Sequence, residues 1–345
     1  MNELTSRQQE ILIRTIESHI ETFLPVGSRT LTERYGMGLS PASVRHEMGV
    51  LEELGFLGHP HTSAGRMPTN KGYRFYVENS IHEEPLTEEL LNLISKTMEG
   101  KAKNLESLLE HASQVLAAIA EEAVVTVSPA LQKLYLKEMT LVPLTGTRLL
   151  VVWCSTSGLV QDSLVEMREA LSLEEAERIR NFINQELSGV SVEALEAELL
   201  KKIRARQDSL RRLYLRALEV VRESAPQWSR PRLFVEGTRY VLNQPEFQDL
   251  EKFRLFMDTV EEKSDLIQLL NQHPGEQGFH VAIGEKELSD RIWDCALVSS
   301  PYQYRGRSVG RVAVLGPRRM PYGRIIGLVK QMAREVSRAL ERSES

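Results

Sequence analysis

Cysteine is scarce in this sequence, and the chain carries no excess of positive charge. Its 345 residues include two cysteines, Cys154 and Cys295, which belong to no CxxC motif and no Cys/His cluster. We therefore expect buried free thiols rather than a disulfide framework or a zinc site. The formal net charge of −5 argues against a protein that is basic over its whole surface.

Several other signals are missing. No apolar run reaches the length of a membrane-spanning segment and no secretory signal opens the chain, so we expect a cytoplasmic protein without membrane contact. The sequence has no P-loop, no dinucleotide-binding fingerprint and no GxSxG motif. These absences favour a protein that is not an enzyme and that holds no cofactor.

A helix-turn-helix pattern is present between residues 25 and 76. Ser40 is a good N-cap residue for a helix over Ala42–Leu54, and a shorter helix is expected before it at Ser28–Tyr35, joined by the turn Gly36–Leu39. The inward face of the second helix carries Val44, Met48 and Leu51. Its outward face carries Ser43, Arg45, His46 and Gly49. This is the pattern of a helix that enters a major groove.

A polar loop follows the second helix. Residues 58–68 are rich in Gly, Pro, Ser and Thr, which suit phosphate oxygens better than burial. Thr69 or Asn70 can cap the next helix, and Thr5 can cap a first helix that runs to about Phe23. Together these segments predict a winged domain. A bare helical hairpin used for packing would not need the polar loop.

Two stretches of this region are unusually specific. They read PVGSRTL from Pro25 and PHTSAGRMPTNKGYRFYV from Pro60. Both resemble the family of heat-inducible transcription repressors HrcA, and a looser resemblance covers nearly the whole chain. Where that family usually has Arg-Asn in the recognition helix, this chain has Arg45-His46. The resemblance implies repression of chaperone operons by a homodimer bound to double-stranded DNA at an inverted repeat called CIRCE.

The expected DNA-binding residues fall into two groups. Those expected at base edges or the adjacent phosphates are Ser40, Ser43, Arg45 and His46. Those expected at phosphates or in the minor groove are Arg29, Thr62, Ser63, Arg66, Lys71 and Arg74. Arg45 is the candidate for a guanine, because its planar guanidinium matches O6 and N7. A metal site at His59 and His61 lacks further ligands nearby, so these histidines are interpreted as loop residues facing DNA.

The whole chain is expected to be an α+β multidomain protein. We expect the winged helix-turn-helix domain at 1–79 and a linker helix at 80–103. Short apolar runs at 138–144, 148–154 and 159–165 predict an antiparallel meander, and strands resume after a long helical region. The resumed strands are expected at 280–284, 296–300 and 310–315.

The family resemblance implies a GAF-like domain interrupted by an inserted dimerising domain. We accordingly expect the GAF-like domain at 104–190 and 272–345, and the mostly helical insert at 191–271. A basic run in the insert consists of Lys201, Lys202, Arg204, Arg206, Arg211, Arg212 and Arg216. It can be a solvated helix face or, less simply, a nucleic-acid contact.

Two functions remain open from the sequence. The first is the dimeric repressor, for which the resemblance also implies the chaperonin as a modulator. Heat would divert chaperonin to unfolded clients, and the active repressor would then decline. The second is a ligand-sensing protein, either a GAF-type regulator of unrelated operons or an enzyme or scaffold whose helix-turn-helix serves protein contacts only.

Overall fold

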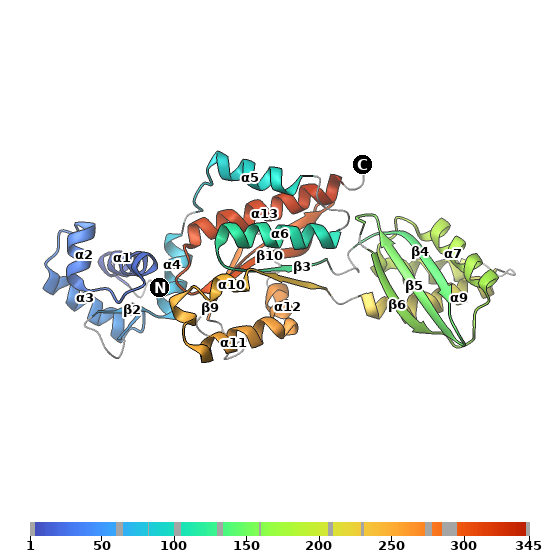
Figure 1. Ribbon diagram of the computed structural model, residues 1–345, viewed down its shortest axis with the longest axis horizontal. Helices are drawn as coiled ribbons and strands as arrows, with labels where there is room; N and C mark the ends of the chain where they lie inside the picture. The colour runs from blue at the N-terminus through green and yellow to red at the C-terminus, as the bar shows by residue number, and fades with distance from the viewer. Residues whose placement is uncertain are drawn as a thin grey trace.

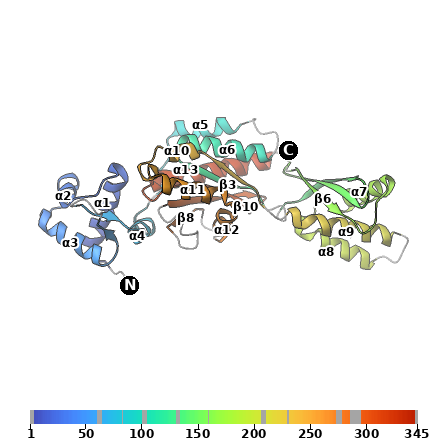
Figure 2. The same cartoon turned by 60° about the horizontal axis from the view of Figure 1, so that its bottom comes forward.

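Three units lie in a row along the long axis of the molecule (Figure 1). The computed structural model describes residues 4–59, 65–81, 83–99, 105–129, 134–158, 160–205, 210–228, 231–272, 278–284 and 295–342. The N-terminal unit is at one end, a five-stranded sheet with its helices is in the middle, and a three-stranded sheet with its helices is at the other end (Figures 1 and 2).

The N-terminal unit has four helices and a two-stranded wing. Its elements are α1 (Ser6–Thr22), α2 (Ser28–Tyr35), α3 (Pro41–Glu53), β1 (Leu57–Gly58), β2 (Met67–Pro68) and α4 (Asn70–Ser80). The sequence signals for the helix starts are confirmed. Thr5 forms a capping box with Gln8, the Ser40 hydroxyl accepts from the Ser43 amide, and Thr69 caps α4.

The apolar face of each helix builds the core of this unit. The fully or almost fully buried side chains include Ile11, Leu12, Ile16, Leu31, Val44, Met48 and Leu51. The predicted inward face of α3 is therefore confirmed. Because Val44, Met48 and Leu51 are fixed in the core, the opposite face of α3 points to solvent.

The central unit is an antiparallel sheet in the order β7-β3-β10-β9-β8. Its strands are β3 (Ala123–Val127), β7 (Leu233–Glu236), β8 (His280–Ile283), β9 (Cys295–Tyr304) and β10 (Arg307–Pro317). Helices cover both faces (Figure 1). One face holds α5 (Glu88–Met98), α6 (Leu105–Ala120) and α13 (Tyr322–Arg342), and the other holds α10 (Thr238–Val241), the 3-10 turn Pro245–Phe247, α11 (Leu250–Glu261) and α12 (Lys263–Gln272).

Two separate cores follow from the alternation of side chains along the strands. Val124 and Val314 join the core under α6 and α13, whereas Val125 and Leu315 join the core that contains Phe256 of α11. A sheet that is apolar on both faces needs a helical layer on each side. The central unit therefore has three layers.

The third unit is an insertion between β3 and β7. It contains β4 (Leu136–Pro143), β5 (Arg148–Ser155), β6 (Val160–Glu166), α7 (Leu173–Leu187), α8 (Val192–Ala205) and α9 (Arg211–Trp228). The three strands pair in the order β4-β5-β6, as the predicted meander requires. One face of this sheet packs its side chains against the helices, and Met139, Val151 and Trp153 are completely buried there.

Sheet membership contradicts the expected domain boundaries. The meander was expected in the GAF-like part at 104–190, but β4, β5 and β6 form a separate sheet. The chain leaves the central sheet after β3 and returns as β7, which pairs directly with β3 through Val124 and Glu236. The inserted unit is therefore about 134–228 rather than 191–271, and α11 and α12 belong to the central unit. Short apolar runs give no sign of which sheet they will join.

The expected linker at 80–103 is fastened to the central unit. The Glu84 amide donates to the Gly323 carbonyl at 3.2 Å, and Glu83 forms an ion pair with Lys330. Ile94 and Met98 of α5 are buried. This segment thus packs against α13 and α6 rather than forming a free connection.

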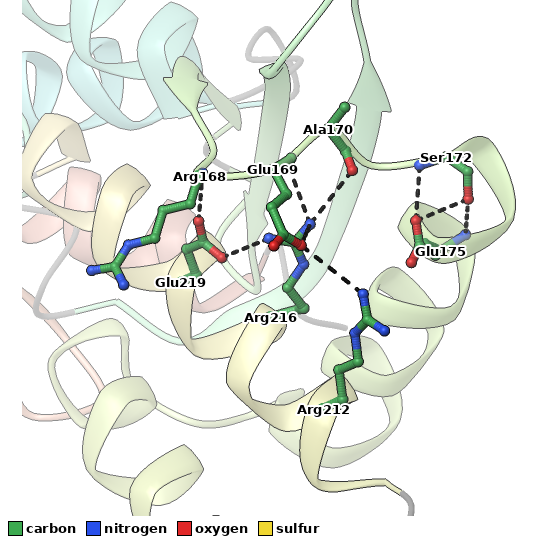
Figure 3. Close-up of polar contacts among 8 residues, drawn as sticks. All are labelled: Arg168, Glu169, Ala170, Ser172, Glu175, Arg212, Arg216 and Glu219. Atoms are coloured by element: carbon green, nitrogen blue, oxygen red, sulfur yellow. Dashed lines mark hydrogen bonds and ion pairs between the residues drawn. The ribbon is translucent and has the colours of Figure 1, made fainter.

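The basic run of the insert is largely occupied by ion pairs. Arg216 on α9 points into the loop before α7, where its Nη2 donates to the Glu169 carbonyl at 3.1 Å and its Nη1 to Glu219 at 3.0 Å (Figure 3). Three further members of the run, Lys201, Lys202 and Arg212, lie beside Glu198, Glu186 and Glu169. These ion pairs favour a role of the basic run in the fold of the insert over a role in contacting nucleic acid.

In the ranges that the structure describes, none of the helices combines the length and the apolar character that a membrane span requires.

Candidate nucleic-acid interface

Helix α3 presents a polar outer face with fixed ends. The Ser40 hydroxyl accepts from the Ser43 amide at 3.1 Å, and the two hydroxyl oxygens are 2.9 Å apart. Ser43, Arg45 and His46 are exposed. The side chains of Arg45 and His46 make no hydrogen bond or ion pair within the described part of the chain. They are therefore free to meet groups outside the protein.

The base of the wing is pinned to the start of α2. Val26 and Arg66 exchange two backbone hydrogen bonds of 2.9 Å each. Gly65 lies so close to Pro25 that a Cβ atom at this position would come within 2.7 Å of the Pro25 carbonyl carbon, so only glycine fits without a shift. The predicted Thr62 and Ser63 lie in the wing loop, outside the described residues.

A groove of about 580 Å³ runs between α2, α3 and the wing. Its charged and polar lining includes Arg29, Arg45, His59 and Arg66. Arg66 is held by Glu52, with its Nε 2.8 Å from a carboxylate oxygen, and by His59 at 2.7 Å. The groove therefore gathers three of the arginines expected at DNA, and two of them, Arg29 and Arg45, have no acidic partner among the described side chains.

Lys71 has a different place from the one predicted. Its Nζ donates to the Leu54 carbonyl at 3.1 Å and lies 4.3 Å from the centre of the Phe56 ring. A cation at this position satisfies the carbonyl end of α3 and complements the helix dipole. Lys71 therefore fixes the end of α3 from within the domain, and it does not line the groove.

Arg74 also lies away from the groove, which corrects its predicted role. Its guanidinium donates to the Ile283 carbonyl at 3.2 and 2.9 Å and to the Gly284 carbonyl at 3.3 Å. These carbonyls belong to the end of β8 in the central unit. Arg74 therefore joins the N-terminal unit to the central unit instead of facing a phosphate.

Further contacts complete this junction. Arg318 donates to Asn70 at 2.7 Å, and the Arg319 guanidinium lies 3.7 Å from the centre of the Phe23 ring. Beneath them the buried His19 Nδ1 is 2.7 Å from the Tyr73 hydroxyl. Burial lowers the pKa of the His19 imidazole to about 4, although nearby Glu246 raises it in part. This imidazole is neutral at pH 7.

Sequence reasoning missed Ser28 and Thr30 as lining residues of the groove. The signal for both was the glycine before them, because Gly27 cannot cap α2 with a side chain. His59, interpreted from the sequence as a loop residue facing DNA, also lines the groove. Nowhere in the described ranges do three or more His, Cys, Asp or Glu side chains gather as metal ligands would. The groove is suited chemically to anionic oxygen atoms.

Comparisons with known proteins agree with the resemblance noted in the sequence. A family model described as the HrcA protein C terminal domain matches residues 106–326. The heat-inducible transcription repressor HrcA of Pelotomaculum thermopropionicum is 32% identical over 339 residues, which cover 98% of this chain and 97% of the relative. The same repressor of Natranaerobius thermophilus is 34% identical over 343 residues, with 99% and 98% covered.

One solved structure has a similar fold. It is the crystal structure of a hypothetical protein at 2.2 Å resolution, and it aligns with a TM-score of 0.60 at 24% identity over 99% of this chain and 100% of that chain. The family model covers well over half of the sequence, and the relatives align from end to end. This chain belongs to the HrcA family of heat-inducible transcription repressors.

Proposed function

We propose that this protein represses heat-shock genes by binding double-stranded DNA through its N-terminal unit. The observation that carries the proposal is the groove in which Arg29 and Arg45 lie without acidic partners beside the exposed face of α3. A recognition helix enters the major groove with its N-terminal residues at base edges. Arg45, in the second turn of α3, can then bind a guanine through two hydrogen bonds, and Arg29 can bind the backbone.

The operator is an inverted repeat of the CIRCE type, read by a homodimer. One small winged domain contacts few base pairs, whereas two copies related by a two-fold axis read both half-sites. The insert offers a surface for this pairing on the side of its sheet that faces away from the helices. There Val142, Leu150 and Leu164 stand opposite one another across β4, β5 and β6, and Val142 and Leu164 are 40% and 50% exposed. Burying this apolar row in a second copy would stabilise a dimer.

The proposed regulation follows from the family. At normal temperature the dimer prevents induction of chaperone genes, and the chaperonin maintains its active form. Any partner that binds the competent state stabilises it by mass action. When heat diverts chaperonin to unfolded clients, the active population declines and the genes are expressed.

The test is a fluorescence-anisotropy titration of the full chain against a CIRCE-type duplex and a scrambled duplex, with and without chaperonin. We expect tight binding to the repeat only. Arg45→Ala should cost roughly 1–3 kcal/mol on the repeat and little on scrambled DNA, since it removes a base contact. Arg29→Ala should weaken both duplexes alike, since it removes a backbone contact.

The two variants form a matched pair, because both remove an exposed arginine that has no internal partner. An equal loss on both duplexes for Arg45→Ala would contradict its assignment to a base. Equal, weak binding of the unaltered protein to both duplexes, even with chaperonin, would contradict the proposed function.

A further inference from the structure

The first turn of α2 begins without a side-chain cap. Gly27 is the N-cap residue, and among the described residues no side chain bonds to the amides that follow it. The other helices of the unit begin with the hydroxyl caps of Thr5, Ser40 and Thr69. The first amides of a helix have no acceptor within the helix and must find one elsewhere. The start of α2 therefore leaves amide donors open.

Backbone geometry does not explain the glycine. Gly27 has φ −93° and ψ 153°, an extended conformation that every residue type adopts. A Cβ atom there would meet its nearest neighbour, the Thr30 Oγ1, at 3.7 Å, an ordinary van der Waals distance. Serine or aspartate would fit and would cap the helix. A glycine at this position keeps the amides free for another acceptor.

A second observation points to a ligand at the same place. Ser28 is only 8% exposed, yet it lines the groove and its hydroxyl has no hydrogen-bond partner among the described residues. Its oxygen atom is not one of the fully buried, unpartnered side-chain atoms of the described residues, so it remains accessible to a ligand in the groove. Thr30 and the Arg29 side chain line the groove beside it. Amides, a hydroxyl and a guanidinium from consecutive residues of α2 thus line the groove, and none of its described lining residues is acidic.

We propose that the start of α2 binds one backbone phosphate of the operator, a step that rests on the proposed function. The positive end of the helix dipole and the open amides favour a phosphate oxygen, and the Ser28 hydroxyl donates a further hydrogen bond. Arg45 lines the same groove from α3. The phosphate held by α2 would therefore flank the base pair that Arg45 reads, and it would fix the depth of α3 in the major groove.

Gly27→Asp tests the site, because the new carboxylate would take the same amides and repel a phosphate. Aspartate is a favoured N-cap, so the thermal unfolding temperature should not fall. Binding to the repeat and to scrambled DNA should weaken about tenfold, and the slope of log K against log salt should become shallower by about one phosphate contact. Asn79→Asp, which adds the same charge at an exposed position of α4 outside the groove, should bind as the unaltered protein does.

Neutral methylphosphonates placed singly along the repeat identify the contact. One position should cost the unaltered protein affinity and cost Gly27→Asp nothing further. The same methylphosphonate profile in both proteins, or full operator affinity in Gly27→Asp, would overturn the phosphate site while the proposed function stands. Failure of the unaltered protein to prefer the repeat would overturn the proposed function as well.

Discussion

His19 is the residue whose ionisation bears most directly on the stability of the N-terminal unit. It lies inside the molecule against Tyr73, and burial lowers the pKa of its imidazole to about 4. Glu246 opposes this shift, and Arg319 and Arg318 add to it. In an unfolded chain the imidazole titrates near its usual value of about 6.5. Between these two values the unfolded state binds the proton and the folded state does not.

The folded protein should therefore lose stability as pH falls below about 6.5, down to about 4. From pH 7 to pH 5 the loss from this residue should be about 2 kcal/mol. His19→Asn keeps a polar atom near Tyr73 and removes the titration. Urea unfolding of both proteins at pH 5, 6 and 7 checks the expectation, and the difference between them should change with pH.

Glu122 also makes the stability of the fold depend on pH. For this reason the stabilities of the two proteins are compared at each pH, instead of following one protein alone. Burial raises the pKa of the Glu122 carboxyl group to about 8, although Arg319 lowers it in part. This carboxyl group stabilises the fold in its protonated form, so its contribution declines as pH rises from about 4 to about 8. Both proteins contain Glu122, so its contribution cancels in the difference. Parallel stability curves for the unaltered protein and His19→Asn would contradict the role given to His19.

At the scale of elements, the end of α3 depends on Lys71. Its ammonium group bonds the Leu54 carbonyl and lies over the Phe56 ring. Lys71→Ala should lower the free energy of unfolding by about 1 kcal/mol, through loss of a helix-end charge contact and a cation–π contact. Arg29→Ala should leave stability unchanged while weakening DNA binding, because Arg29 has no such partner.

Urea denaturation and DNA titration of the same two variants separate these roles. If Lys71→Ala kept full stability and instead lost affinity on every duplex, the phosphate role predicted from the sequence would be right. The contacts of Lys71 with Leu54 and Phe56 would then contribute little to the free energy of unfolding.

Helices of the N-terminal unit were predictable because their signals are local. Thr5, Ser40 and Thr69 each bond an amide within three residues, and such caps can be recognised in the sequence. Exposure of Arg45 followed from helical spacing in the same way. The groove that unites Arg29 and Arg45 could not be predicted, since it depends on the contact of Val26 with Arg66.

Contacts between residues far apart in the sequence account for the errors in the predicted role of Arg74 and in the predicted domain boundaries. The two carbonyl groups that Arg74 binds are 209 and 210 residues away in the sequence, and nothing near Arg74 indicates them. Strand β7 has four residues, and only its pairing with β3 shows that the chain has returned to the central sheet. The boundaries of the insert were misplaced for that reason, because periodicity identifies strands without assigning them to sheets.

At the scale of the whole molecule, specific contacts fix both ends of the central unit. Toward the insert, Arg305 at the turn between β9 and β10 lies 4.7 Å from the centre of the Tyr135 ring, and the Tyr304 hydroxyl is 2.8 Å from that of Thr156. Toward the N-terminal unit, Arg74 bonds a carbonyl group at the end of β8, and Arg318 bonds Asn70. The position of each α3 relative to its own insert is therefore set by these contacts.

In the proposed homodimer, these contacts would set the distance between the two recognition helices. Arg74→Ala should loosen the N-terminal unit, since it removes hydrogen bonds from a charged donor worth roughly 1–3 kcal/mol. Affinity for the natural repeat should fall, because binding would then have to fix the N-terminal unit relative to the central unit, which costs free energy. Affinity for an isolated half-site should not change, because Arg74 lies away from the groove.

A series of duplexes with half-site spacing changed by one or two base pairs measures this effect. The unaltered protein should discriminate sharply among the spacings, and Arg74→Ala should give a flatter profile with a lower maximum. Arg324→Ala is the matched control, because it removes an exposed arginine of α13 whose guanidinium bonds only the Ile119 carbonyl of the central unit itself among the described residues. If Arg74→Ala kept the spacing profile of the unaltered protein, the junction would not set operator geometry. The distance between the recognition helices would then depend on the dimer contact alone.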